Sequence, residues 1–425
     1  MRDASSWLSG IRSFSGVGAL SNGEMESLAI SLRIGFEDEM HRIFISASTS
    51  DHETLLSLVE LVLESVRMAL VRRTGVQLPS EMPGGFGGAS VLMDGILSYR
   101  SFGKSSFLPS PYHERVNVLP SPFYGAFQRG YLVLTPSYLV SFEKPVALEK
   151  VLEEWKKIPD AAVSVIGVNI GISGFALRGK KALSSISDRG LVRRNNEDSC
   201  LSSTVEISRS GDRTRYNILC VADGVGGAGY GEIASREAVL EAYNSLIIGI
   251  LSSSDEREIV RASISSANRR VLEEKKRRGE MGTTMTLALI RDNYVTIGHA
   301  GDSRAYLIDE GIKQITRDHK YVEDLVERGL ITREQAKYHP QRNIITSALG
   351  MENPRIDLNE QRISDRTSLL LTTDGLPDLV DDSEILACFI NYPPHPDLIG
   401  GLLVRMANAR GGHDNTSVSI MTHLI

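Results

Sequence analysis

Apolar residues recur at spacings of three and four across residues 55–71, with Glu60 and Glu64 between them. This period predicts a helix, and Asp51 is suited to cap its start. Just before it, residues 41–47 alternate between apolar and polar side chains, as a half-buried strand does. The first part of the chain is therefore expected to fold as a compact α+β unit.

The pattern changes over the next hundred residues. Residues 84–124 are rich in glycine, proline and serine, which predicts loops or a surface groove. Strands at residues 131–134 and 138–142 and a helix around residues 148–157 are expected to follow. The uncharged stretch 161–177 has only the minimum length of a membrane span and contains three glycines, so buried strands at a domain junction are favoured.

A hinge is expected at residues 179–181, where glycine and two lysines follow the apolar junction. It divides the chain into an N-terminal α+β domain, residues 1–178, and a second domain, residues 179–425. No catalytic constellation is visible in residues 1–178, so a regulatory or targeting module is the expectation there.

The second domain alternates between helical and strand patterns. Residues 231–247 and 255–279 predict helices, whereas residues 293–299 and 304–307 predict paired strands. Periodicity alone indicates an α+β fold.

Acidic residues occur where strands of this domain are expected to begin or end. Apolar runs end at Asp223 and near Asp374, and Asp414 precedes the run 416–420. In an antiparallel sheet the end of one strand and the start of its neighbour share an edge. Three acids far apart in sequence are thus expected to converge on one rim. A single Asp-Gly pair, such as Asp94-Gly95, indicates no more than a turn.

Composition narrows the class of protein. The 425 residues are 41% hydrophobic and 24% charged, as in an ordinary globular protein of two or three domains. The net charge of -6 gives no basic surface for nucleic acid. Three cysteines without ligand spacing and an N-terminus without a signal-peptide core predict a cytoplasmic protein, with no membrane partner.

Six sequence blocks share an order and spacing that is specific in combination. They are residues 187–198 (SDRGLVRRNNED), 221–227 (VADGVGG), 281–284 (MGTT), 301–306 (GDSRAY), 371–376 (LTTDGL) and 411–416 (GGHDNT). From about residue 182 to 425 the chain resembles the metal-dependent (Mg/Mn) serine/threonine protein phosphatases of type 2C, in their bacterial-style form. The resemblance implies an αββα sandwich, a β-sandwich flanked by helices, preceded by the separate N-terminal domain.

The resemblance also implies a set of metal ligands. Asp223 would bridge two Mg2+ or Mn2+ ions, Gly224 would bind through its carbonyl, and a side chain at 224 would obstruct that approach. Asp302 matches the aspartate that helps to bind a third, weaker ion. The complete implied ligand set is Glu197, Asp198, Asp223, Gly224, Asp302, Asp374 and Asp414. Oxygen ligands suit such hard ions, which activate a water for in-line attack on phosphate.

Arg193 lies where the family places the arginine that grips the substrate phosphate, a task that suits its planar fork. Many relatives carry a histidine just after the Asp-Gly motif, but residues 226–232 contain none. Either a metal-bound water protonates the leaving group or another group substitutes, with His299, His319 and His413 as candidates. Residues 321–338 match the variable flap beside the family's active site.

Three hypotheses remain open. The first is an active phosphatase for phosphoserine and phosphothreonine in proteins, with Asp223, Asp374, Asp414 and Arg193 as its catalytic residues and a cognate kinase in its pathway. The second is a pseudophosphatase scaffold that binds phosphoproteins or a kinase. The third is a switch phosphatase gated by the N-terminal domain.

Overall fold

The computed structural model describes residues 13–21, 26–81, 87–94, 96–102, 116–119, 123–126, 130–134, 139–142, 162–171, 181–209, 212–226, 230–252 and 255–423. The chain divides into two compact units. The N-terminal unit comprises Met1–Leu32, His41–Leu177 and Thr204–Tyr216, and the C-terminal unit comprises Arg33–Met40, Arg178–Ser203 and Asn217–Ile425. Two segments, residues 33–40 and 204–216, therefore belong to a different unit from their neighbours in sequence.

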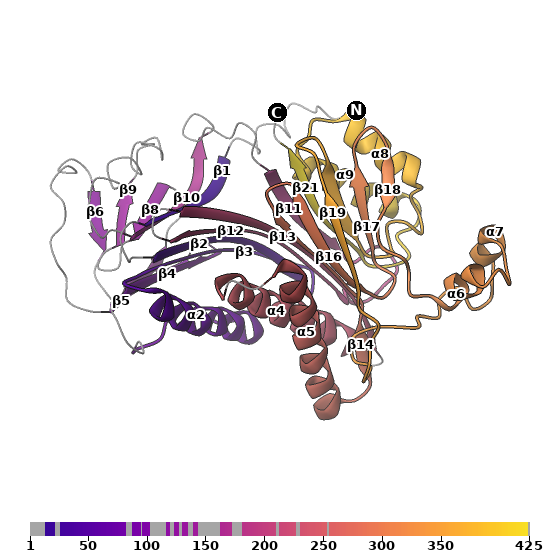
Figure 1. The fold of residues 1–425 in the computed structure, drawn as a ribbon, viewed down its shortest axis with the longest axis horizontal. Coiled ribbons are helices and arrows are strands. Elements are labelled where there is room, and N and C mark those ends of the chain that lie inside the picture. Colours follow the sequence, from indigo (N-terminus) through magenta and orange to yellow (C-terminus); the bar gives the residue numbers. More distant parts are fainter. Residues whose placement is uncertain are drawn as a thin grey trace. The chain divides into compact units, whose positions relative to one another are not determined.

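The described residues of the N-terminal region form strands and one long helix (Figure 1). Its elements are β1 (Ser13–Ser21), β2 (Glu26–Phe36), β3 (Glu39–Thr49), α2 (His52–Arg72), β4 (Gly87–Met93), β5 (Ile96–Phe102), β6 (Val116–Leu119), β7 (Phe123–Ala126), β8 (Gly130–Leu134), β9 (Leu139–Phe142) and β10 (Ala162–Gly171). One sheet has the strand order β1-β10-β8-β9-β6, and β3, β4, β5 and β7 follow one another in the other sheet.

Several predictions for this region are confirmed. Helix α2 begins after Asp51, whose carboxylate accepts a hydrogen bond from the Thr54 N–H at 2.9 Å. Strands β3, β8 and β9 also lie where the apolar pattern predicted them, and β10 occupies most of the uncharged stretch. The helix predicted around residues 148–157 and the first two hinge residues, 179–180, lie outside the described residues.

The prediction of loops for residues 84–124 was wrong for much of that stretch. Strands β4 and β5 form an antiparallel hairpin in which Val91 is paired with Ser98. Asp94 adopts the left-handed conformation at its turn, with φ 49°. The many glycines and serines hid the strand pattern, although Val91, Leu92 and Leu97 are buried.

The C-terminal region holds the second set of elements. Its strands are β11 (Lys181–Asp188), β12 (Asp198–Arg209), β13 (Asp212–Gly226), β14 (Met281–Thr283), β15 (Met285–Arg291), β16 (Tyr294–Ala300), β17 (Arg304–Ile308), β18 (Ile312–Gln314), β19 (Asp357–Arg362), β20 (Ser368–Thr372) and β21 (Thr416–His423). Its helices are α4 (Tyr230–Leu251), α5 (Glu256–Arg278), α6 (Tyr321–Glu327), α7 (Arg333–Lys337), α8 (Asp382–Asn391) and α9 (Pro396–Ala409).

These elements form four layers. One sheet has the order β11-β21-β20-β17-β18, and in the other β19, β16, β15, β13 and β12 follow one another. Helices α4 and α5 pack on the β15–β16 side, whereas α8 and α9 pack on β18, β11 and β21 (Figure 1). The predicted αββα sandwich is confirmed.

Strand β20 shows why the layers hold together. Successive side chains of a strand point to opposite faces. Leu369 and Leu371 are therefore buried between the sheets with Leu219, while Leu370 is buried against the helical layer with Leu403. The continuous apolar run thus indicates a strand covered on both faces.

The predicted pairing of residues 293–299 with 304–307 was wrong. Strand β16 pairs with β15 and β19, whereas β17 pairs with β18 and β20 in the other sheet. The turn at Gly301 carries the chain from one sheet to the other, and this glycine has a φ of 117°. A Cβ there would also lie only 2.5 Å from the Thr284 side chain. The apolar pattern shows both strands but not the sheet that each joins.

The helices of the part that the structure describes include none long and apolar enough to cross a membrane.

Candidate metal centre

Asp223 lies within strand β13, which continues past it to Gly226 and pairs with β14 there. The predicted strand end at Asp223 was therefore wrong by three residues. Its carbonyl oxygen accepts hydrogen bonds from the Thr284 N–H at 2.8 Å and the Thr283 hydroxyl at 2.9 Å. Its own N–H donates to Thr284 Oγ1 at 2.9 Å. The Gly-Thr-Thr block thus fixes the backbone that presents this carboxylate.

Asp374 and Asp414 come from the neighbouring strands β20 and β21. These strands are antiparallel, with Thr372 paired to Val418, so the end of one adjoins the start of the other. The shared rim that we predicted forms for these two acids, whereas Asp223 reaches the rim from the other sheet. Gly375 permits the approach, because a Cβ there would collide with the Asn415 backbone.

Asn415 positions the acidic loops, a role that sequence reasoning missed. Its Oδ1 accepts a hydrogen bond from the Glu197 N–H at 2.8 Å. Its Nδ2 donates to the carbonyl oxygens of Arg189 and Asn195 at 2.9 and 3.0 Å. Buried amides usually have such partners, so the only signal in sequence was its place beside Asp414.

Gly231, at the start of helix α4, is a second residue that sequence reasoning missed. A Cβ at this position would lie 2.8 Å from the Gly224 carbonyl oxygen and 2.9 Å from Glu197 Oε1. The absent side chain leaves a cradle between a carbonyl and a carboxylate oxygen. A Cβ on Gly224 would instead collide with the Gly231 and Glu197 backbones. Packing against these backbones therefore requires glycine at 224. We had expected a different reason, namely that a side chain would obstruct the approach of a metal ion to the carbonyl.

The carboxylates at the rim resist ionisation. Burial, together with the charges of Asp198 and Asp374, raises the pKa of Asp223 well above its usual value. Burial and the charge of Asp302 do the same to the pKa of Asp374. Burial raises the pKa of Asp198 to about 7, although Thr373 donates a hydrogen bond to it at 2.7 Å. Such a cluster gains stability from a cation.

Two side-chain cations already contact the rim. Arg193 donates to Asp414 Oδ2 at 2.7 Å, and Lys320 Nζ lies 2.8 Å from Asp302 Oδ2. Arg193 is half exposed, whereas Lys320 and Asp302 are buried. Burial alone would lower the pKa of Lys320, but the attraction of Asp302 and Asp374 outweighs it and raises that pKa. Sequence reasoning had not singled out Lys320.

The oxygen atoms of this site indicate which kind of cation it can bind. Within the described ranges, no three His, Cys, Asp or Glu side chains are already gathered closely enough to hold a metal ion. However, Asp198 Oδ1 is buried without a hydrogen-bond partner, and the cradle at Gly231 presents two further oxygens. This all-oxygen donor set fits Mg2+ or Mn2+, with side-chain movement needed to complete the coordination.

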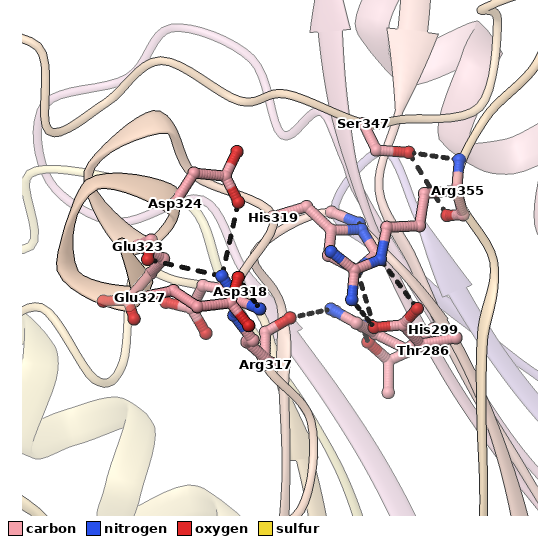
Figure 2. A network of polar contacts seen from close by, with 12 residues as sticks. Thr286, His299, Arg317, Asp318, His319, Glu323, Asp324, Glu327, Ser347 and Arg355 are labelled. Atoms are coloured by element: carbon pink, nitrogen blue, oxygen red, sulfur yellow. Dashed lines mark hydrogen bonds and ion pairs between the residues drawn. The ribbon is translucent and has the colours of Figure 1, made fainter. Parts of the chain in front are cut away.

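Two of the candidate general acids, His299 and His319, belong to a network of polar contacts (Figure 2). His299 Nε2 donates to the Arg317 carbonyl oxygen at 3.0 Å, and its Nδ1 lies 2.9 Å from Thr286 Oγ1. Burial and the neighbouring His319 lower the pKa of His299 to about 4, so it is neutral at pH 7. His319 Nδ1 accepts from the Gly301 N–H at 3.2 Å. Both rings are therefore engaged in supporting the fold.

The predicted flap contains the short helices α6 and α7, which project from the sheets of their unit (Figure 1). Arg317 joins the base of α6 to the network of Figure 2 through Asp324 at 3.3 Å and Glu327 at 2.7 Å. Large apolar side chains on the flap, Leu330 and Tyr338, are exposed. The flap base is thus fixed while its outer part faces solvent.

Comparison with known proteins identifies the chain's family. The family described as Protein phosphatase 2C matches residues 194–407, half of the chain. The chain belongs to this family. The six sequence blocks are therefore those of the protein phosphatase 2C family, as we predicted. The enzyme class that we predicted is also the class of this family.

Two curated relatives and a solved structure show the extent of the likeness. PstP of Mycobacterium tuberculosis, a serine/threonine protein phosphatase, is 38% identical over 55% of this chain, which spans only 43% of that relative. The protein phosphatase PhpP of Streptococcus pneumoniae is 32% identical over 56% of this chain and 96% of its own length. The M. tuberculosis phosphatase structure has a TM-score of 0.50 and 32% identity, covering 58% of this chain and 99% of that one.

Proposed function

We propose that the chain is a metal-dependent phosphatase that hydrolyses phosphoserine and phosphothreonine in proteins. The observation that carries the proposal is the meeting of Asp223 with Asp374 and Asp414 at one rim of two sheets, where burial and the neighbouring carboxylates raise the pKa of Asp223 and of Asp374. Such mutual repulsion is costly unless the site binds cations, and it is typical of functional sites. The phosphatase names of the relatives support this substrate class.

The residues of the chain would have distinct roles. Asp223 would help to hold both ions, and Asp374 and Asp414 would help to hold the first of them. The Gly224 carbonyl and Glu197, which meet at the Gly231 cradle, would face the second ion, and Asp198 would orient its water shell. When bound, Mg2+ or Mn2+ would supply a nucleophilic water at neutral pH and neutralise the phosphoryl charge.

Arg193 would bind the substrate phosphate. It lies at the rim because it donates to Asp414 Oδ2, and its half-exposed guanidinium can turn toward an incoming phosphate. A bidentate pair with two phosphate oxygens would then hold the phosphoryl group for attack. His413, which is exposed beside Asp414, stays a candidate for protonating the leaving group, as does a bound water.

The decisive experiment combines activity with stability. In Asp223→Asn and Asp374→Asn variants, hydrolysis of p-nitrophenyl phosphate and of a phosphothreonine peptide with Mn2+ should fall more than about 100-fold, because a ligand is lost. The stability of the metal-free protein should rise by about 1 kcal/mol, because repulsion is relieved. Urea unfolding in EDTA would measure that change.

Asp94→Asn is the matched control, because Asp94 also precedes a glycine at a turn but lies in the N-terminal unit. Its activity should equal that of the wild type. Wild-type protein that binds manganese yet hydrolyses neither substrate would favour the scaffold hypothesis instead. Activity that persists in EDTA would contradict the metal-dependent mechanism.

The pathway and the N-terminal domain remain predictions of the sequence. Phosphorylated proteins are the expected substrates, a serine/threonine kinase the expected counterpart and the cytoplasm the expected compartment. Gating of the phosphatase by residues 1–178 is a further hypothesis.

A further inference from the structure

Lys320 is the most unusual charged residue near the proposed metal centre. Its ammonium is buried and lies 2.8 Å from Asp302 Oδ2. Lysine is almost never fully buried unless its charge is paired in this way. Its charge also acts on Asp374 and Asp378. Lys320 therefore brings a cation of the chain itself into the group of carboxylates that would otherwise need metal ions.

The backbone fixes Lys320 in this place. Its carbonyl oxygen accepts the Glu323 N–H at 3.0 Å at the start of α6. The preceding His319 N–H donates to the Gly301 carbonyl at 2.7 Å, directly beside Asp302. The lysine and the aspartate thus extend from two segments that hydrogen bonds hold together, so the ion pair is a built feature of the fold.

We propose that Lys320 is a resident counter-ion that occupies Asp302, so that the metal centre of this chain holds two divalent ions and no third. This inference rests on the proposed metal centre and revises the part that the sequence assigned to Asp302. A dication at Asp302 would have to displace a buried ammonium and leave it without its partner, which is strongly unfavourable. The other oxygen, Asp302 Oδ1, is buried without a partner and can accept from a water of the site.

Equilibrium dialysis of the full chain against Mn2+ tests the count of ions. The wild type should bind two ions at saturation, and Lys320→Met should bind three because Asp302 becomes available. Asp302→Asn should still bind two. Three ions in the wild type, or loss of an ion in Asp302→Asn, would overturn the inference, and so would two ions in Lys320→Met.

Melting in EDTA tests the ion pair separately. Lys320→Met should lower the melting temperature by about 10 °C, because breaking a buried pair leaves an uncompensated charge. Adding Asp302→Asn to that variant should restore most of the loss. Lys313→Met removes an exposed lysine of β18 and should change neither readout. An unchanged melting temperature in Lys320→Met would count against the pairing.

The two proposals fail in different ways. A wild-type protein that binds no Mn2+ would overturn the proposed metal centre, while the melting temperatures would still decide whether Lys320 neutralises Asp302. A Lys320→Met variant that does not fold would itself show that the pair is essential to the metal-free protein, and Asp302→Asn would then decide the ion count.

Discussion

Gly231 is the second residue of helix α4 and has no side chain, and the space that this leaves lies between the Gly224 carbonyl oxygen and Glu197. Glycine is usually unfavourable in a helix, by about 1 kcal/mol relative to alanine. Its presence here therefore gives up helix stability for access to two oxygens. At this scale, single atoms rather than elements decide what the rim can bind.

A Gly231→Ala variant separates these two effects. The new Cβ would contact the fixed Gly224 carbonyl and push Glu197 aside, so the affinity for Mn2+ should fall about 10-fold or more while the protein stays folded. Isothermal titration calorimetry would measure the affinity. Gly401→Ala in α9, where a Cβ has nothing within 4 Å, is the control and should leave Mn2+ binding unchanged. Equal affinity in both variants would refute a role for the cradle.

His299 should make stability depend on pH. Its folded pKa of about 4 lies below the unfolded value of 6.5. The stability it contributes is therefore complete above pH 6.5 and is lost as the pH falls toward 4, by about 2 kcal/mol between pH 8 and 5. Urea unfolding in EDTA should show this loss as the difference between the wild type and His299→Gln. The same pH profile in both proteins would contradict the assignment.

The elements were predictable where local chemistry alone determines them. The period and cap of α2, the helices α4 and α5, and the strand after Asp414 all follow from neighbouring residues. The sheet that each strand joins could not be predicted, as β16 and β17 show, because a turn such as Gly301 redirects the chain without a signal in the apolar pattern. Contacts such as Lys320 with Asp302 depend on that tertiary path.

The candidate site, too, was predictable only where neighbouring residues in the sequence determine it. The acids Asp223, Asp374 and Asp414 were predicted from motif and strand position, and the family blocks supplied the other candidates. Asn415 and Gly231 were missed because their roles are to hold or to make room for other groups. Such roles become visible only when the Glu197 loop and α4 are placed side by side.

At the scale of the whole molecule, the C-terminal unit includes residues 33–40, the turn end of the β2–β3 hairpin. Glu37 forms an ion pair with Arg236 of α4, and Phe36 lies 5.9 Å beneath the same guanidinium. Arg33 pairs with Asp397 of α9. Met40 packs against the core between the sheets. A contiguous C-terminal domain, as predicted from residue 179, would lack all of these contacts.

A chain cut to residues 179–425 should therefore be less stable than the full protein, by about 3 kcal/mol or more, mainly through lost packing. Thermal melting and urea unfolding would measure the difference. A chain that starts at residue 26 and keeps the hairpin should retain the contacts and melt close to the full protein. Equal stability of the 179–425 chain would show that the hairpin contributes nothing.

The hairpin also affects how such a protein can be inherited or re-engineered. A gene segment that encodes residues 179–425 would move the acidic motifs to a new partner but leave part of their packing behind. Recombination or gene fusion at this boundary would therefore give a less stable protein. Residues 33–40 would have to be transferred together with the phosphatase, or an equivalent hairpin of the new host would have to replace them.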